Sequence, residues 1–203
     1  MPIPNWKQAQ RGCLVILNSS GTEDGTIAFQ YNPKDLSRTI KPDYSAKPSN
    51  DDGISFQKKA AVQTMNVTWM IQAVDNMWAG EVADDGLIPI LAKLETLVNP
   101  SVADLSTWET NLKSAIVTVP PLPVISVLLQ MGSRQWPVKI NSLTLKEKAF
   151  DQNLVPIEAE VQADLEVLTY DNVLASSPAN GRYETYHKAV EKSAGDYTVP
   201  TEF

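Results

Sequence analysis

The sequence predicts a mainly β fold, an antiparallel β-sandwich or barrel with one or two helices. Fourteen prolines and nine glycines divide the 203-residue chain into short segments. Most of these segments alternate apolar and polar residues, the period of two that is typical of half-buried strands. Clear helical spacing is confined to residues 84–99, with a weaker pattern at residues 101–115. Strands therefore dominate the predicted fold.

Two strands near the start of the chain are expected to form a hairpin. They cover residues 13–17 and 26–31, and a polar loop joins them. Asn32-Pro33 ends the second strand, because proline lacks an amide hydrogen and restricts the residue before it. Residues 41–59 are rich in Pro, Asp, Ser, Asn and Lys, which predicts a mobile surface loop.

A long amphipathic strand and the best helix of the chain follow this loop. The strand, residues 62–74, has one apolar face made of Met65, Val67, Trp69, Ile71 and Ala73. The helix lies within residues 84–99, where the spaced apolar residues are Leu87, Ile90, Leu91, Leu94, Leu97 and Val98. In the weaker helical segment, Ser106 and Glu109 have the spacing of a capping box.

A second hairpin is predicted around Gly132-Ser133. This pair separates two apolar, β-rich segments, residues 124–131 and 134–146. Glycine supplies the positive φ that a two-residue hairpin turn requires. Pro137 cannot donate to a ladder, so we expect its strand to lie at an edge or to contain a bulge there.

The last predicted strand, residues 155–169, alternates most cleanly. Its polar face carries Glu158, Glu160, Gln162, Asp164 and Glu166. Carboxylates spaced about 6.5–7 Å apart along a strand repel one another unless water, salt or a basic partner screens them. This face is therefore expected outside the core of one subunit. Three interpretations stay open: a solvated outer face, the wall of a water-filled channel, or a subunit contact.

The sequence does not predict an enzyme. Paired carboxylates serve glycoside hydrolysis, but a catalytic pair needs two different environments and an open strand face gives all its carboxylates similar ones. Cys13 and His187 are the only cysteine and histidine, which excludes a Cys/His zinc site and most histidine-based catalysis. No phosphate-binding loop or nucleophile elbow occurs either. We expect no cofactor and no metal.

Composition and charge describe an acidic globular chain. Seventeen Lys and Arg face 24 Asp and Glu, a net charge of −7, which argues against specificity for nucleic acid. We expect synthesis and folding in the cytoplasm and no membrane insertion by this chain, because it shows no signal-like start and no long apolar stretch. One β domain, residues 1–171, is expected to precede a C-terminal appendage, residues 172–203, with a short helix ended by Gly195.

Residues 29–36, Phe-Gln-Tyr-Asn-Pro-Lys-Asp-Leu, resemble a signature of the tube-initiator proteins of contractile injection systems, which are phage tail-like particles. The matching residues are Phe29, Gln30, Asn32, Pro33 and Leu36. Three landmarks follow in the family's order: a helix at residues 86–97, a proline-led strand at residues 120–132, and a closing loop and strand at residues 150–167. The family usually has a glycine near Leu154, a departure that bears on the turn there, although Asn153 is a residue that can also adopt a positive φ. The resemblance covers roughly residues 10–171.

This resemblance implies a tail-tube type of fold and a structural role. The chain would form a ring, expected to be a hexamer, that initiates the inner tube and links it to the spike at the baseplate. The implied partners are the inner tube protein, the spike protein, and baseplate or sheath components. Assembly in the cytoplasm would precede incorporation into the particle, released or membrane-associated. Many members continue into a peptidoglycan-binding LysM module, which we do not expect here.

The residue pattern fits such a role, because exposed sheet edges can pair with the edges of neighbouring subunits. We expect the carboxylate row to face a lumen or a subunit, and its members are Glu158, Glu160, Asp164 and Glu166. The loop at residues 41–59 would contact a neighbouring subunit through Lys41, Lys47, Asp51, Asp52, Lys58 and Lys59. The alternative is a monomeric β-barrel that binds a small ligand inside; a monomer that retains a small apolar molecule would favour it.

Overall fold

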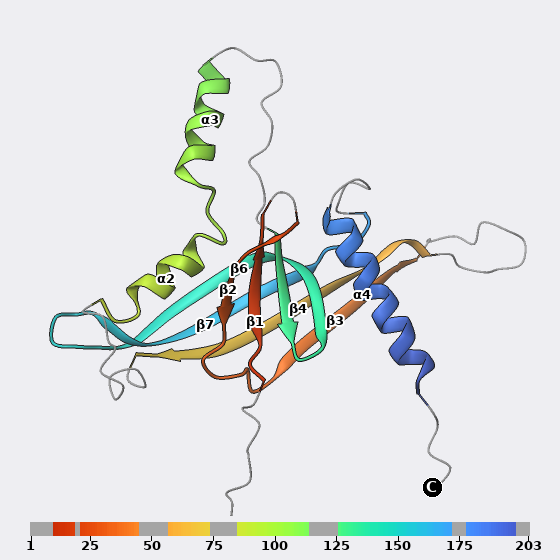
Figure 1. Cartoon of the computed structure of the whole chain (residues 1–203), viewed down its shortest axis with the longest axis horizontal. Coiled ribbons are helices and arrows are strands. Elements are labelled where there is room, and N and C mark those ends of the chain that lie inside the picture. The colour runs from red at the N-terminus through yellow and green to blue at the C-terminus, as the bar shows by residue number, and fades with distance from the viewer. Residues whose placement is uncertain are drawn as a thin grey trace, which may run out of the picture.

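The computed structural model describes residues 10–18, 21–44, 57–73, 85–113, 126–171 and 178–197. The strands are β1 (Cys13–Leu17), β2 (Glu23–Ala28), β3 (Leu36–Tyr44), β4 (Gln57–Gln72), β5 (Ser126–Met131), β6 (Arg134–Phe150) and β7 (Pro156–Val167). The helices are α2 (Ile88–Glu95), α3 (Val102–Lys113) and α4 (Pro178–Gly195). All strands belong to one antiparallel sheet with the order β2-β1-β5-β6-β7-β4-β3 (Figure 1). The predicted mainly β fold is confirmed, and the described helices are the two expected within residues 84–115 and the one expected to end at Gly195.

The sheet folds back on itself through β6. The first residues of β6 pair with β5, and from Val138 onward the strand pairs with β7. Side chains of β1, β2 and β5 therefore share one core with side chains of β4 and β7. Phe29, just after β2, contacts Trp69 of β4 with their ring centroids 4.7 Å apart. Two layers of one sheet thus enclose the core, while β2 and β3 remain as its two edges.

Pro137 lies in a central strand, and the prediction of an edge position is wrong. It is opposite Leu128 of β5, and its carbonyl accepts a hydrogen bond of 2.8 Å from the amide of Leu168. The amide and carbonyl of one strand residue point to the same side, so the missing N–H faces the end of β7. Proline is tolerated there because the β6–β7 ladder begins only at Val138.

Both predicted hairpins are present. β1 pairs with β2, which runs from Glu23 to Ala28 and so begins and ends earlier than expected. β5 pairs with β6 across a turn in which Gly132 has a φ of 63°. This positive φ is the conformation for which the turn needs glycine.

The predicted loop at residues 41–59 is wrong at both ends. Leu36–Tyr44 forms the edge strand β3, and β4 begins at Gln57. Lys41 is opposite Val62, and Asp43 is opposite Lys59, so these two lysines belong to strands. The pairing shifts between Lys41 and Asp43, a bulge at Pro42 that lets a proline sit in an edge strand.

The apolar face of β4 and the helix α2 form much of the core, as predicted. All five residues of the predicted apolar strand face are buried: Met65, Val67, Trp69 and Ile71 in β4, and Ala73 just after it. Four leucines of α2 and its flanks are buried as well: Leu87, Leu91, Leu94 and Leu97. Gly86 has a φ of 52°, and an added Cβ would lie 2.7 Å from the carbonyl oxygen of Pro156. This close approach allows the amide of Leu87 to donate to that oxygen at 2.9 Å.

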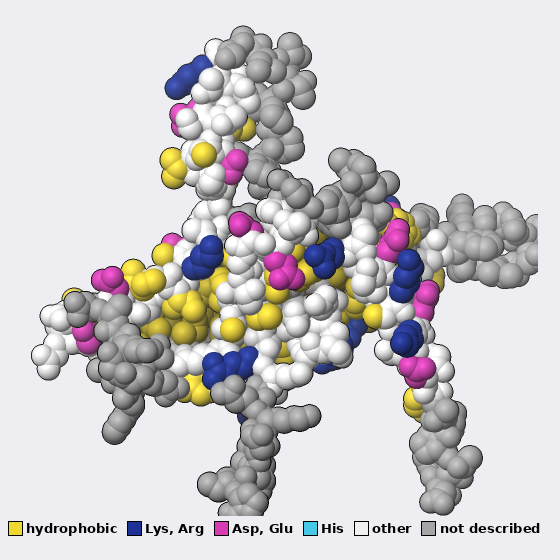
Figure 2. Space-filling view, in the orientation of Figure 1, with side chains coloured by type: hydrophobic (Ala, Val, Ile, Leu, Met, Phe, Trp, Pro, Cys, Tyr) yellow, Lys and Arg dark blue, Asp and Glu magenta, His cyan; other side chains and the backbone are white. Residues whose placement is uncertain are grey.

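Helix α3 stands away from the sheet and buries no side chain (Figure 1). Its cap is not the predicted Ser106–Glu109 pair: the amide of Asp104 donates to Ser101 Oγ at 3.1 Å. Ser101 Oγ in turn donates to the Asp104 carboxylate at 2.6 Å. Apolar side chains of α3 face solvent (Figure 2), and they are Val102, Leu105, Trp108 and Leu112.

The tight turn before β7 takes its positive φ at Leu154, at 63°, and not at Asn153. Asp151 organises the turn, because its carboxylate accepts hydrogen bonds of 2.8 Å from the amides of Asn153 and Val155. These bonds fix the backbone, so the left-handed conformation falls on the residue between the two donors. The Leu154 side chain is largely exposed, so it meets no packing constraint there.

Candidate functional site

The carboxylate row lies on the outer face of β7, between β4 and β6. Each alternate residue of β7 points into the core, and Ala159, Val161 and Ala163 are fully buried. The carboxylates between them are only half-buried. The predicted division of this strand into an apolar and a polar face is therefore correct.

Side chains of the neighbouring strands contact all four carboxylates of this row. Lys148 Nζ lies 2.6 Å from Glu160 Oε2, and Lys139 Nζ lies 3.0 Å from Glu166 Oε1. Gln72 Nε2 donates to Glu158 at 3.2 Å. Lysines of β6 therefore pair with two of the four carboxylates and supply part of the screening that their spacing requires, while Glu158 and Asp164 have neutral hydrogen-bond partners.

Asp164 lies at the centre of this surface. It is opposite Asn66 of β4 and Ser142 of β6, and both side chains donate to its carboxylate, Ser142 at 2.6 Å. These two hydrogen bonds hold the pKa of Asp164 below its usual value. The hydrogen bond from Lys148 likewise lowers the pKa of Glu160. Both groups therefore stay ionised to a lower pH than an ordinary carboxyl group.

Two side-chain amides of the motif at residues 29–36 connect backbone segments that are distant in sequence. Gln30 Nε2 donates to the carbonyl of Gln72 at 2.8 Å, and Gln30 Oε1 accepts from the amide of Gln72 at 2.7 Å. Asn32 does the same before β1: its Oδ1 accepts from the amide of Gly12 at 2.8 Å, and its Nδ2 donates to the carbonyl of Gln10 at 2.9 Å. Each side-chain amide thus makes one donated and one accepted hydrogen bond with the backbone, as the backbone of a paired strand residue would.

The remaining motif residues pack the same region. Phe29 is fully buried against Trp69, Leu36 contacts the core from the start of β3, and Pro33 is partly buried. A Cβ at Gly12 would come within 2.8 Å of the Phe29 ring and would also clash with Met131. The motif therefore holds the two halves of the folded sheet together. The sequence pattern located these residues, but only the structure reveals their role.

The predicted inter-subunit loop is only partly within the described residues. Lys47, Asp51 and Asp52 lie outside them, and Lys58 lies in β4. Within this strand, the amide of Ala60 donates to the carboxylate of Asp171 at 2.9 Å, which ties the start of β4 to the segment that follows β7.

The two sheet edges differ in charge. β3 is nine residues long and exposed along its length except at Leu36, and it carries Arg38 and Lys41 against Asp43. β2 is shorter and begins with Glu23 and Asp24, both exposed. One edge is therefore basic and the other acidic.

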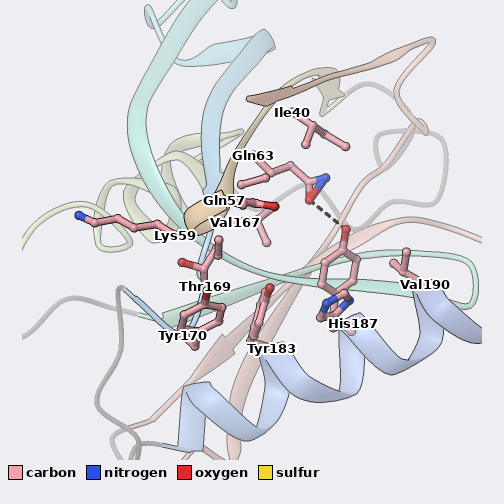
Figure 3. A pocket seen from close by; sticks show the side chains of 13 residues that line it. Ile40, Gln57, Lys59, Gln63, Val167, Thr169, Tyr170, Tyr183, His187 and Val190 are labelled. Carbon is pink, nitrogen blue, oxygen red and sulfur yellow. Dashed lines mark hydrogen bonds between the residues drawn. The ribbon is translucent and has the colours of Figure 1, made fainter. Parts of the chain in front are cut away.

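Helix α4 crosses the open side of the folded sheet. The sequence predicted only a short helix here, whereas α4 has 18 residues. The Tyr186 hydroxyl donates to the buried Gln63 Oε1 at 2.9 Å (Figure 3). A groove of about 520 Å³ lies beside this contact, lined by Tyr170, Tyr183 and His187 among others. Burial raises the pKa of Tyr183. A second groove lies on the other flank of α4.

Catalytic and metal-binding features are few. Burial raises the pKa of Cys13, which disfavours the reactive thiolate. His187 is exposed on α4, with Nε2 3.9 Å from Glu191 Oε1. Within the described ranges, no three His, Cys, Asp or Glu side chains are grouped to hold a metal ion. The helices of this part of the chain include none that is long and apolar enough to span a membrane.

No protein-family model matches the chain. No curated protein matches it either. Among solved structures, the chain is similar to one from "Virion of native gene transfer agent (GTA) particle", with 10% identity and a TM-score of 0.27. The similarity covers 77% of this chain and 90% of the other, but a TM-score this low does not establish a common fold.

Proposed function

We propose that this protein is a structural subunit of a contractile injection system or related phage tail-like particle. It forms a ring of six copies that initiates the inner tube and links it to the spike at the baseplate. The motif at residues 29–36 suggests this family. The open, two-edged sheet is the observation that supports assembly most directly.

A ring follows if the β2 edge of one copy pairs with the β3 edge of the next. Unpaired backbone donors and acceptors along an exposed edge strand favour strand addition. Glu23 and Asp24 on β2 complement Arg38 and Lys41 on β3. Contact between two different edges is heterologous, and such contacts generate closed rings when the rotation between copies closes.

The polar outer face of β7 suits a wall that faces water. Its carboxylates keep the surface hydrophilic, and lysine partners of Glu160 and Glu166 reduce the field of one sign. The alternative, a barrel that holds a small ligand, is less well supported. Large side chains such as Phe29, Trp69 and Trp136 fill the interior, and the grooves described here lie outside it, beside α4.

Edge charges provide the test. Glu23→Lys combined with Asp24→Lys makes both edges basic. We expect this double variant to remain as single copies under conditions in which the wild-type chain forms rings. Adding Lys41→Glu should restore part of the assembly. Glu95→Lys with Glu109→Lys changes the net charge equally at exposed helix positions and is the matched control.

Size-exclusion chromatography with light scattering, at several protein and salt concentrations, measures these states. A wild-type chain that stays monomeric at high concentration and does not join a tube or spike protein contradicts the proposal. So does a control variant that loses assembly to the same extent. The proposed role involves no catalysis, and a turnover abolished by Glu160→Gln would contradict that part.

A further inference from the structure

Three of the four arginines of the chain meet in one groove. The arginines are Arg11, Arg38, Arg134 and Arg182. The last three come from β3, β6 and α4, far apart in sequence, and line a groove of about 550 Å³ between α4 and the β5–β6 hairpin. Lys192 adds a fourth cation, while Asp196 is the one acidic residue of the lining. A local excess of positive charge thus exists on a chain with a net charge of −7.

Neutral partners hold these arginines. The guanidinium carbons of Arg38 and Arg134 lie 5.6 and 4.9 Å from the centre of the Trp136 ring. Arg38 also donates to the Tyr186 hydroxyl at 3.5 Å, and Arg182 donates to the carbonyl of Gly21 at 3.3 Å. Among the described residues, none of the three makes a salt bridge with a carboxylate.

Such arginines are positioned but not neutralised. A guanidinium has five N–H donors, and these contacts use few of them. Stacking on a tryptophan face fixes the plane of the guanidinium, so little side-chain entropy is lost when it binds a carboxylate through two parallel hydrogen bonds. The geometry therefore favours an anionic ligand with several acidic groups.

We infer that this groove binds an acidic peptide segment of a partner protein. Carboxylates of the peptide contact Arg38, Arg134 and Arg182, and its apolar side chains pack on the apolar part of the lining. Trp136, Ala189 and Val190 are among the apolar lining residues. A peptide that alternates acidic and apolar residues matches both the arginines and these apolar side chains.

A nucleic acid fits less well. Its phosphates carry charge along the whole strand, which would extend beyond the groove over a chain with a net charge of −7. The apolar lining residues offer nothing to a phosphate backbone, whereas burying leucine or valine side chains against them is favourable. The peptide therefore explains both features of the groove.

Fluorescence anisotropy tests this inference with a short fluorescein-labelled peptide of alternating glutamate and leucine. We expect salt-sensitive binding to the full chain. Arg134→Gln and Arg182→Gln should each weaken it about tenfold, as expected for loss of one charge-assisted bidentate pair. Arg11→Gln, outside the groove, is the matched control and should leave the affinity unchanged. Circular dichroism verifies that each variant is folded.

Several outcomes would overturn the inference. These are no binding by the folded wild-type chain, equal binding of a glutamine–leucine peptide, and tighter binding of a single-stranded oligonucleotide of equal charge. An equal loss in the Arg11→Gln variant would also overturn it. Arg38 belongs to both the β3 edge and the groove, but the edge-charge variants change Glu23, Asp24 and Lys41, which do not line the groove. These variants should therefore still bind the peptide when assembly is blocked, so the two proposals can fail separately.

Discussion

Helices α2 and α4 are attached to the same sheet in different ways. α2 has eight residues, yet Leu91 and Leu94 are 5% and 0% exposed, and its flanking leucines are buried too. α4 has eighteen residues, and none of residues 181–195 is buried. Polar contacts of Tyr186 and Arg182 attach it, and the partly buried Tyr186 is its described side chain that packs against the core. The number of buried apolar side chains, and not helix length, decides whether a helix belongs to the core.

The largest expected effect follows from removing a buried side chain of α2. Leu94→Ala leaves a cavity in a fully buried site, and we expect it to lower the free energy of unfolding by about 2–5 kcal/mol. Val190→Ala on α4, where the side chain is 43% exposed, should change it by about 0.5 kcal/mol or less. Urea denaturation measures both values, and similar losses would abolish the distinction between the two helices.

A smaller effect is expected from the polar attachment of α4. Tyr186→Phe removes the hydroxyl that donates to Gln63, which costs about 0.5–1.5 kcal/mol of unfolding free energy. Hydrogen exchange should become faster in α4 and remain unchanged in β7, because only the helix is released. Tyr197→Phe, at an exposed position after α4, is the control. Faster exchange throughout the sheet would mean that α4 is part of the core after all.

The smallest expected effect lies on the outer face of β7 and involves neither helix. Folding lowers the pKa of Glu160 and Asp164 from ordinary values of 4.5 and 3.8. Such groups stabilise the fold above these ordinary values, and their contribution is lost as the pH falls through the lower, folded-state pKa. Stability should therefore decline below about pH 4.5.

Asp164→Asn should reduce this acid-dependent decline, because the variant has one shifted carboxyl group fewer. Asp35→Asn, at an exposed position before β3, is the comparison. Thermal unfolding followed at a series of pH values measures the slope for each chain. An unchanged slope in Asp164→Asn would mean that its hydrogen bonds contribute nothing to the pH dependence.

Features with a strong local pattern were predictable. Alternation placed Val161 and Ala163 in the core and Glu160 on the outer face, and helical spacing identified the leucines of α2. Failures occurred where long-range pairing overrides local preference. β3 contains Pro42 and several polar residues, which are typical of a loop, but pairing with β4 makes it a strand. Pro137 appeared unsuited to a central strand until the end of β7 was known.

The order of residues along the chain determined the strand faces, the apolar face of α2 and the acidic overall charge, because these depend on neighbours two to four positions apart. Tertiary structure alone decided which distant groups meet. It brought Gln30 to the backbone of Gln72 and placed Arg38, Arg134 and Arg182 around one groove. Contacts of this kind depend on how the sheet folds back at β6. A local sequence periodicity does not predict where a sheet folds back.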